Sequence, residues 1–227
     1  MRRMVLSCFV LLAVAIANLS GACSKSSENQ SARSAGPDAK RDPPMSQRLV
    51  RGDPKALVIQ REELPTNFTM AGGEPKGAGE YSQVYFNPHA LVDESGTDTG
   101  LLGVIANLAI LHAPAAATET FTDQGGLDVE SVISDIRVAT PGAQPLAAEP
   151  CSPTIDGTDK VLAFRVHYIL NGAHVFEYRF RFRVGNAVGN LIVSALATAE
   201  GEEPATLIDR AQSIAERQVS RLNSSRH

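Results

Sequence analysis

The residues of this chain with the clearest chemical potential are four arginines in two neighbouring stretches of alternating sequence. Arg179, Arg181 and Arg183 occupy every second position, and Arg165 lies in the stretch before them. Alternate residues of a β-strand share a face, so the first three would form a row. Guanidinium forks suit carboxylates and phosphates. The row therefore predicts a site for an anionic ligand, a lipid headgroup or an acidic protein partner; the simpler interpretation is the solvated face of an antiparallel sheet.

No motif supplies the further groups that catalysis or cofactor binding would need. The glycines of residues 72–79 lack the Lys-Ser or Lys-Thr of a phosphate-binding loop, and residues 93–98 lack the spacing of a calcium loop. The five histidines show no zinc-binding spacing, and we expect His167 and His174 to lie on opposite faces of a hairpin. A Gly-x-Ser-x-Gly elbow is absent from the sequence. We expect no catalytic residues, no metal and no cofactor. A Ser-His-Asp triad whose members lie far apart in the sequence has no spacing by which to recognise it, so it stays an alternative.

Charge and composition narrow the class of protein. The 227 residues are 43% hydrophobic and 20% charged, and the formal net charge is −4. This is the composition of an ordinary globular protein. A mildly acidic chain has no electrostatic reason to bind nucleic acid, so we expect no nucleic-acid partner.

The N-terminus has the layout of an export signal. Arg2 and Arg3 precede an apolar run, and the small residues Ser20, Gly21 and Ala22 end it. Residues 19–23, Leu-Ser-Gly-Ala-Cys, resemble a bacterial lipobox. The resemblance implies that residues 1–22 are a signal peptide and that Cys23 is acylated, which would place the protein on the outer side of the cell membrane. Simple secretion and an uncleaved anchor are the alternatives.

A polar segment separates Cys23 from the first apolar stretch of the domain. Residues 23–51 are rich in Ser, Lys, Arg, Asp and Pro and contain almost no large apolar side chain. Such a segment cannot bury enough surface to offset its loss of conformational entropy. We therefore expect a disordered, lipid-anchored tether.

The domain itself combines strand and helix patterns. We expect strands at residues 56–59, 81–86 and 101–111, followed by a helix that begins near Pro114 and a second one capped by Asp128. The glycines of residues 72–79 and the stretch 142–153 are interpreted as loops. Cys151 is the only cysteine within the domain, so it is either a free loop thiol or half of an intermolecular disulfide.

Two alternating stretches, 162–168 and 176–182, predict a β-hairpin around Asn171-Gly172. A two-residue turn would place Phe164 opposite Arg179, so that the apolar face of one strand would lie beside the charged face of the other. A three-residue loop would instead pair Phe164 with Tyr178 and Arg165 with Glu177, so we prefer that register. It would bring Arg165 beside the other three arginines.

A strand at 188–197 and a C-terminal helix with an apolar stripe from Leu207 to Leu222 complete the pattern. The order predicts one α+β domain over residues 52–223, with helices packed on an antiparallel sheet of about six strands, and a short tail at 224–227.

Several short segments carry a family resemblance. Residues 57–68, 117–121, 182–186 and 215–222 resemble the extracellular sensor domains of mycobacterial serine/threonine kinases and PsbP-like domains. The resemblance implies a PsbP-like layer architecture and the binding of a ligand or partner, with no catalytic residues to transfer. Members of the kinase-sensor group carry disulfides, whereas this chain has only Cys151 in the matching region.

These observations together predict a membrane-tethered, non-enzymatic, sensor-like binding lipoprotein of the cell envelope. Its expected partners are the membrane, through the lipid anchor, and an anionic ligand or another envelope protein. Two alternatives remain, which are a carrier of an apolar ligand such as a lipid, and a hydrolase with a dispersed triad.

Overall fold

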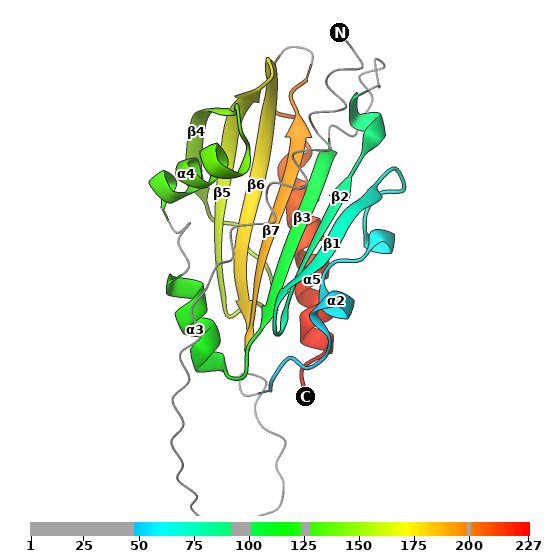
Figure 1. Cartoon of the computed structure of the whole chain (residues 1–227), viewed down its shortest axis with the longest axis vertical. Helices are drawn as coiled ribbons and strands as arrows, with labels where there is room; N and C mark the ends of the chain where they lie inside the picture. The colour runs from blue at the N-terminus through cyan, green and yellow to red at the C-terminus, as the bar shows by residue number, and fades with distance from the viewer. Residues whose placement is uncertain (1–47, 92–100, 124–127, 199–200) are drawn as a thin grey trace, which may run out of the picture.

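The computed structural model describes residues 48–91, 101–123, 128–198 and 201–227. They form one antiparallel seven-stranded sheet in the order β1-β2-β3-β7-β6-β5-β4 (Figure 1). The predicted α+β class is confirmed, with seven strands in place of about six. The strands are β1 Thr69–Gly77, β2 Glu80–Phe86, β3 Leu101–Ile110, β4 Gln144–Cys151, β5 Lys160–Leu170, β6 Ala173–Val184 and β7 Ala187–Leu196.

Helices cover both faces of this sheet. The α-helices are α2 Pro54–Leu57, α3 Pro114–Asp123, α4 Val129–Ala139 and α5 Leu207–Ser224, and short 3-10 turns occur at Arg61–Glu63 and Pro88–Leu91. In the view of Figure 1, α3 and α4 lie in front of the sheet and α5 lies behind it. Among the described residues, no helix has the length and apolar character needed to cross a membrane.

The strand predictions were wrong in three places. Residues 144–151 and 69–77 are the two edge strands, and prolines are tolerated there because an edge strand has unpaired backbone groups. Residues 56–59 are not a strand. Asp53 accepts a hydrogen bond from the Lys55 N–H, Pro54 occupies the first turn, and the short helix α2 results.

The hairpin register was also wrong. Phe164 pairs with Arg179, Arg165 with Tyr178 and Val166 with Glu177. The connection is a two-residue turn, in which Asn171 has φ 52° and Gly172 has φ 83°. Asn-Gly is the preferred sequence for such a turn, because both positions need positive φ.

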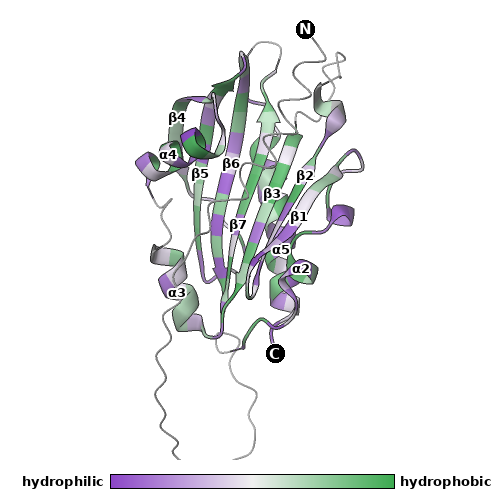
Figure 2. Ribbon diagram, in the orientation of Figure 1, coloured by the Kyte–Doolittle hydropathy of each residue, from purple (hydrophilic) through white to green (hydrophobic). Residues whose placement is uncertain are grey.

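The register follows from the burial of both sheet faces. Phe164, Val166 and Tyr168 pack with Val132 and Ile136 of α4 on one face. The aromatic side chains of β6 point to the other face and pack into the main core with α5: they are Phe176, Tyr178, Phe180 and Phe182. Figure 2 shows the resulting alternation of hydrophilic and hydrophobic residues along β6. The prediction had assumed that the arginine face was solvated, so matching of the apolar faces selected the incorrect pairing.

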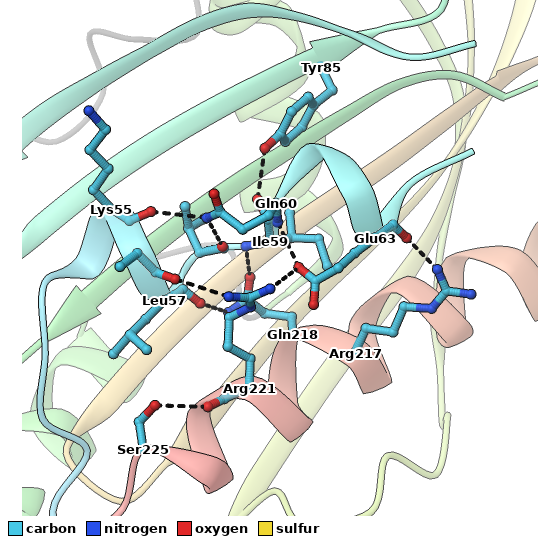
Figure 3. Close-up of polar contacts among 12 residues, drawn as sticks. Lys55, Leu57, Ile59, Gln60, Glu63, Tyr85, Arg217, Gln218, Arg221 and Ser225 are labelled. Carbon is cyan, nitrogen blue, oxygen red and sulfur yellow. Dashed lines mark hydrogen bonds and ion pairs between the residues drawn. The ribbon is translucent and has the colours of Figure 1, made fainter. Parts of the chain in front are cut away.

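The segment that leads into the domain is held by α5. Gln218 accepts a hydrogen bond from the Ile59 N–H and donates one to the Leu57 carbonyl, and Arg221 pairs with Glu63 at 2.8 Å (Figure 3). The two ends of the described chain also meet, because Val50 pairs with Arg226 in a β-bridge. Residues 48–51 and 225–227, assigned from the sequence to the tether and the tail, therefore contact each other.

Candidate functional site

The structure brings together three of the four predicted arginines. Arg179, Arg181 and Arg183 (the arginine row) share the face of β6 that α3 and α4 cover, since they pair with Phe164, Leu162 and Lys160 of β5. Arg165 pairs with Tyr178 and lies on the opposite, α5-covered face. The prediction that Arg165 joins the row is wrong, because it depended on the incorrect register.

The arginine row contacts other residues of its own chain. Arg179 forms an ion pair with buried Glu177 at 2.9 Å, and the same carboxylate accepts a hydrogen bond from the Tyr168 hydroxyl at 2.7 Å. Arg181 donates to the Thr120 carbonyl of α3 at 2.6 Å and stacks over Phe121 at 5.4 Å. Burial lowers the pKa of Arg181.

Arg183 completes this arrangement at the N-terminal half of α3. It donates to the Thr118 hydroxyl and lies 3.8 Å from a carboxylate oxygen of Asp159. The side chains of Arg179 and Arg183 are only 16% and 22% exposed, so the row is not the solvated sheet face of the simpler interpretation. Two of its members hold α3 on the sheet through Thr118 and Thr120.

Beside the row lies an open groove of about 470 Å³, which we call the Pro150 groove. Its floor is formed by Leu162 and Phe164, the strand neighbours of Arg181 and Arg179. Asp128, Cys151 and Ser152 contribute the polar part of its lining. The other lining residues are apolar: Val129, Pro150, Pro153, Val161 and Ala163.

Two local features position the walls of the Pro150 groove. On one side Asp128 caps α4 by accepting a hydrogen bond from the Ser131 N–H at 2.7 Å, and this bond holds the pKa of Asp128 below its usual value. On the other side Pro150 and Cys151 end the edge strand β4, opposite Phe164 and Ala163. This site was not predicted from the sequence, because the prolines of β4 are typical of a loop and the run Pro150-Cys151-Ser152-Pro153 carries no pattern that indicates a groove wall.

Cys151 also borders a second groove of about 270 Å³ on the α5 side, together with Tyr178, Phe180 and Ile208. Its thiol is free. Burial raises the pKa of Cys151, and this favours the protonated, unreactive thiol.

The prediction that His167 and His174 diverge is wrong. Nε2 of His167 lies 2.9 Å from Nδ1 of His174, across the β5–β6 pair. The correct register places both rings on the α5-covered face, where His167 stacks on Phe176 with 4.2 Å between ring centroids. Burial and the neighbouring His174 lower the pKa of His167.

The remaining candidates from the sequence are a dispersed catalytic triad, a metal site, the calcium-like loop and the lipid anchor. In the described part of the chain, no hydrogen bond joins a serine or cysteine to a histidine, and no cluster of three or more metal-ligating side chains occurs. Cys23 and residues 93–98 lie outside the described residues. The fold and the site thus define an α+β protein with a single antiparallel sheet and an apolar groove at its β4 edge.

Comparisons with known proteins give two low-scoring structural matches. No protein-family model and no curated protein matches the chain. Among solved structures, an uncharacterised protein from Mycobacterium smegmatis is 13% identical, with a TM-score of 0.34, over 75% of this chain and 83% of that chain. A mutant of protein Mog1 is 16% identical, with a TM-score of 0.33, over 72% of this chain and 87% of that chain. At these scores the similarity carries no argument about fold or function.

Proposed function

We propose that this protein is a non-enzymatic binding lipoprotein of the cell envelope, tethered through Cys23, which takes an acyl chain into the Pro150 groove. The observation that carries the proposal is the groove itself, an opening of about 470 Å³ with a mostly apolar lining at one edge of the sheet. Its volume is within the range of about 300–1,000 Å³ typical of small-molecule sites, which are also largely apolar.

The contacts that the arginine row already makes within the chain favour an apolar ligand over an anionic one. Arg179 is paired with Glu177, Arg183 lies beside Asp159, and Arg181 is already hydrogen-bonded to the backbone of Thr120. An anion would have to displace these contacts. Half-buried Leu162 lies between the row and the opposite wall of the groove, and an acyl chain can cover it without breaking an ion pair.

The proposed anchor supports an acyl chain as the occupant. Cys23 precedes the described domain by 24 residues of polar sequence, so a lipidated chain would hold the domain close to a membrane surface. The concentration of acyl chains near the groove is then high, because the membrane is close. Burial of apolar surface contributes roughly 25 cal/mol per Å², and this supplies the driving force for the chain to leave water.

The test uses residues 24–227, which lack the signal and the lipid but retain every described contact, and a fluorescent fatty acid as the probe. Val129→Glu places a charge in the groove wall at the first position of α4, where an acidic residue suits the helix dipole. Because Val129 also packs, partly buried, against the core cluster under α4, the unfolding temperature of the variant is measured alongside to show that it is folded. Leu146→Glu is the matched control, because Leu146 is 53% exposed on β4 and does not line the groove.

We expect the wild-type protein and Leu146→Glu to bind the probe equally. Val129→Glu should bind it at least about tenfold more weakly, since a penalty of about 1.4 kcal/mol is sufficient for that factor. Absence of binding by the wild-type protein, or equal binding by the two variants, would overturn the proposal.

A further inference from the structure

We propose that the acyl chain in the Pro150 groove ends in a carboxylate, as in a free fatty acid, and that Lys160 binds this head group. The inference rests on the proposed function and names the class of ligand for the same site. The observation that carries it is the position of the Lys160 ammonium, 5.1 Å from the ring centroid of Phe121 in α3. Leu162 of the groove floor packs against the cluster that contains this ring.

Lys160 lies just beyond the α3 end of the groove. It is the first residue of β5, and it shares a strand face with Leu162 and Phe164, because alternate residues of a strand point to the same side. Two residues of a strand span about 6–7 Å, a distance that a lysine side chain covers. The end of a chain that lies over Leu162 is therefore within reach of the ammonium.

The two ends of the groove carry opposite charges. Val129 at the start of α4 packs against the cluster that contains Phe164, whereas Leu162 packs against the cluster of α3. Figure 1 shows the two helices at different heights along β5. At the α4 end, the lowered pKa of Asp128 keeps its carboxylate ionised at neutral pH, and Lys160 lies at the α3 end. A carboxylate head group is repelled by the first and attracted by the second, so it points toward α3.

Lys160 is available for a ligand. Its side chain is exposed, and no carboxylate of the described residues lies within ion-pair distance of it. The neighbouring Arg183 already lies 3.8 Å from Asp159, which is why the head group is assigned to the lysine. Arg181, at 5.4 Å over the same Phe121 ring, adds positive potential at this end while it keeps its contact with α3. An ammonium with three donors suits a single carboxylate.

The experiment measures the affinity of residues 24–227 for two fluorescent probes with the same acyl chain, a free fatty acid and its methyl ester. Lys160→Gln removes the charge, and Lys160→Arg keeps it. The matched control is Lys55→Gln, because Lys55 is also exposed but lies in α2, whose Leu57 packs into the core on the α5 side of the sheet. Unfolding temperatures show that the variants are folded, since substitutions at exposed positions usually change stability little.

We expect Lys160→Gln to bind the fatty acid about fivefold more weakly than the wild-type protein does, the upper range for an exposed ion pair. Its affinity for the methyl ester should be unchanged, because the ester carries no charge. Lys160→Arg and Lys55→Gln should bind both probes as the wild-type protein does.

The outcomes separate this inference from the proposed function. Unchanged binding of the fatty acid by Lys160→Gln, or an equal loss for the acid and the ester, would overturn the role of Lys160 and leave an acyl chain in the groove. Binding of the ester alone by the wild-type protein would do the same. Failure of the wild-type protein to bind either probe would overturn both proposals.

Discussion

The ring of Phe182 in β6 lies against Gly189 of the neighbouring strand β7, with no room for a side chain between them. A Cβ atom at Gly189 would lie 2.3 Å from Cζ and 2.4 Å from Cε2 of Phe182, and this ring is only 1% exposed. The pair joins two of the central strands beneath α5. The absence of a side chain at residue 189 is therefore a packing requirement of the main core.

Gly189→Ala should lower the free energy of unfolding by about 1–3 kcal/mol, because an overpacked core must shift to relieve the clash. Urea denaturation measures this change. Gly72→Ala in β1 is the control, since a Cβ there meets nothing within 4 Å, and it should change stability by no more than about 0.5 kcal/mol. Equal effects of the two substitutions would contradict the assigned packing.

A second prediction concerns the attachment of the N-terminal segment to α5. Gln218→Met keeps the length of the side chain but leaves the buried Ile59 N–H and the Leu57 carbonyl without their partner. Each unsatisfied buried group costs roughly 1–3 kcal/mol, so the free energy of unfolding should fall by several kcal/mol. Hydrogen exchange at the Ile59 amide should accelerate as well.

Gln212→Met on the same helix is the control for this prediction. The hydrogen bond from Gln212 to the Thr154 carbonyl is solvent-exposed, so its loss should change stability by less than about 0.5 kcal/mol. If the two glutamine variants were equally stable, α5 would not hold residues 57–59 in the way described.

Much of this fold could be predicted from local sequence. Asp128 does cap α4, Pro114 does begin α3, and the apolar run after residue 100 is β3, an interior strand of the sheet. These features depend on groups within one turn or one strand, which is why residue types and their spacing identify them. The edge strands were missed because their prolines and glycines are typical of loops as well.

The turn sequence Asn171-Gly172 favours the observed two-residue register, but the prediction gave more weight to matching the apolar faces of the hairpin. The hairpin's alternating pattern is equally compatible with either pairing, and the choice depends on what covers each face. Phe164 can lie beside Arg179 because α4 covers Phe164 while the arginine pairs with Glu177. That information lies in residues 129–139, far from the hairpin in sequence. The placement of Arg165 and the convergence of the two histidines follow from the same choice.

A third prediction concerns stability at alkaline pH. Burial and the nearby Glu62 and Glu63 raise the pKa of Tyr85 to about 12, and its hydroxyl donates to the Ile59 carbonyl. The unfolded chain loses this proton near pH 10 and the folded chain only near pH 12. The stabilisation that the raised pKa of Tyr85 contributes is therefore fully present below pH 10, and it is lost as the pH rises from about 10 to about 12.

Tyr85→Phe should be less stable than the wild-type protein at pH 8, by roughly 0.5–1.5 kcal/mol for the lost hydrogen bond. Between pH 10 and 12 the wild-type protein should lose the larger amount, since two pKa units correspond to roughly 2–3 kcal/mol. Thermal denaturation across this range measures the difference. Parallel pH profiles for the two proteins would contradict the raised pKa.

A fourth prediction addresses the anchor. In its host, the purified protein should begin at an acylated Cys23, and intact mass spectrometry measures this directly. Cys23→Ala should move the protein from the membrane fraction to the soluble fraction. A protein that still begins at Met1 without lipid would contradict the anchor, whereas the fold would be unaffected, because every described contact lies within residues 48–227.

The most direct test of the central proposal is to map where an acyl chain lies when it is bound. Residues 24–227 would be irradiated with a fatty acid that carries a photoreactive group at its chain end, and the labelled peptides identified by mass spectrometry. We predict labelling within residues 150–153 and 161–164, along one wall and the floor of the Pro150 groove, and its loss in Val129→Glu. Labelling confined to other surfaces, or unchanged labelling of these peptides in Val129→Glu, would contradict the account.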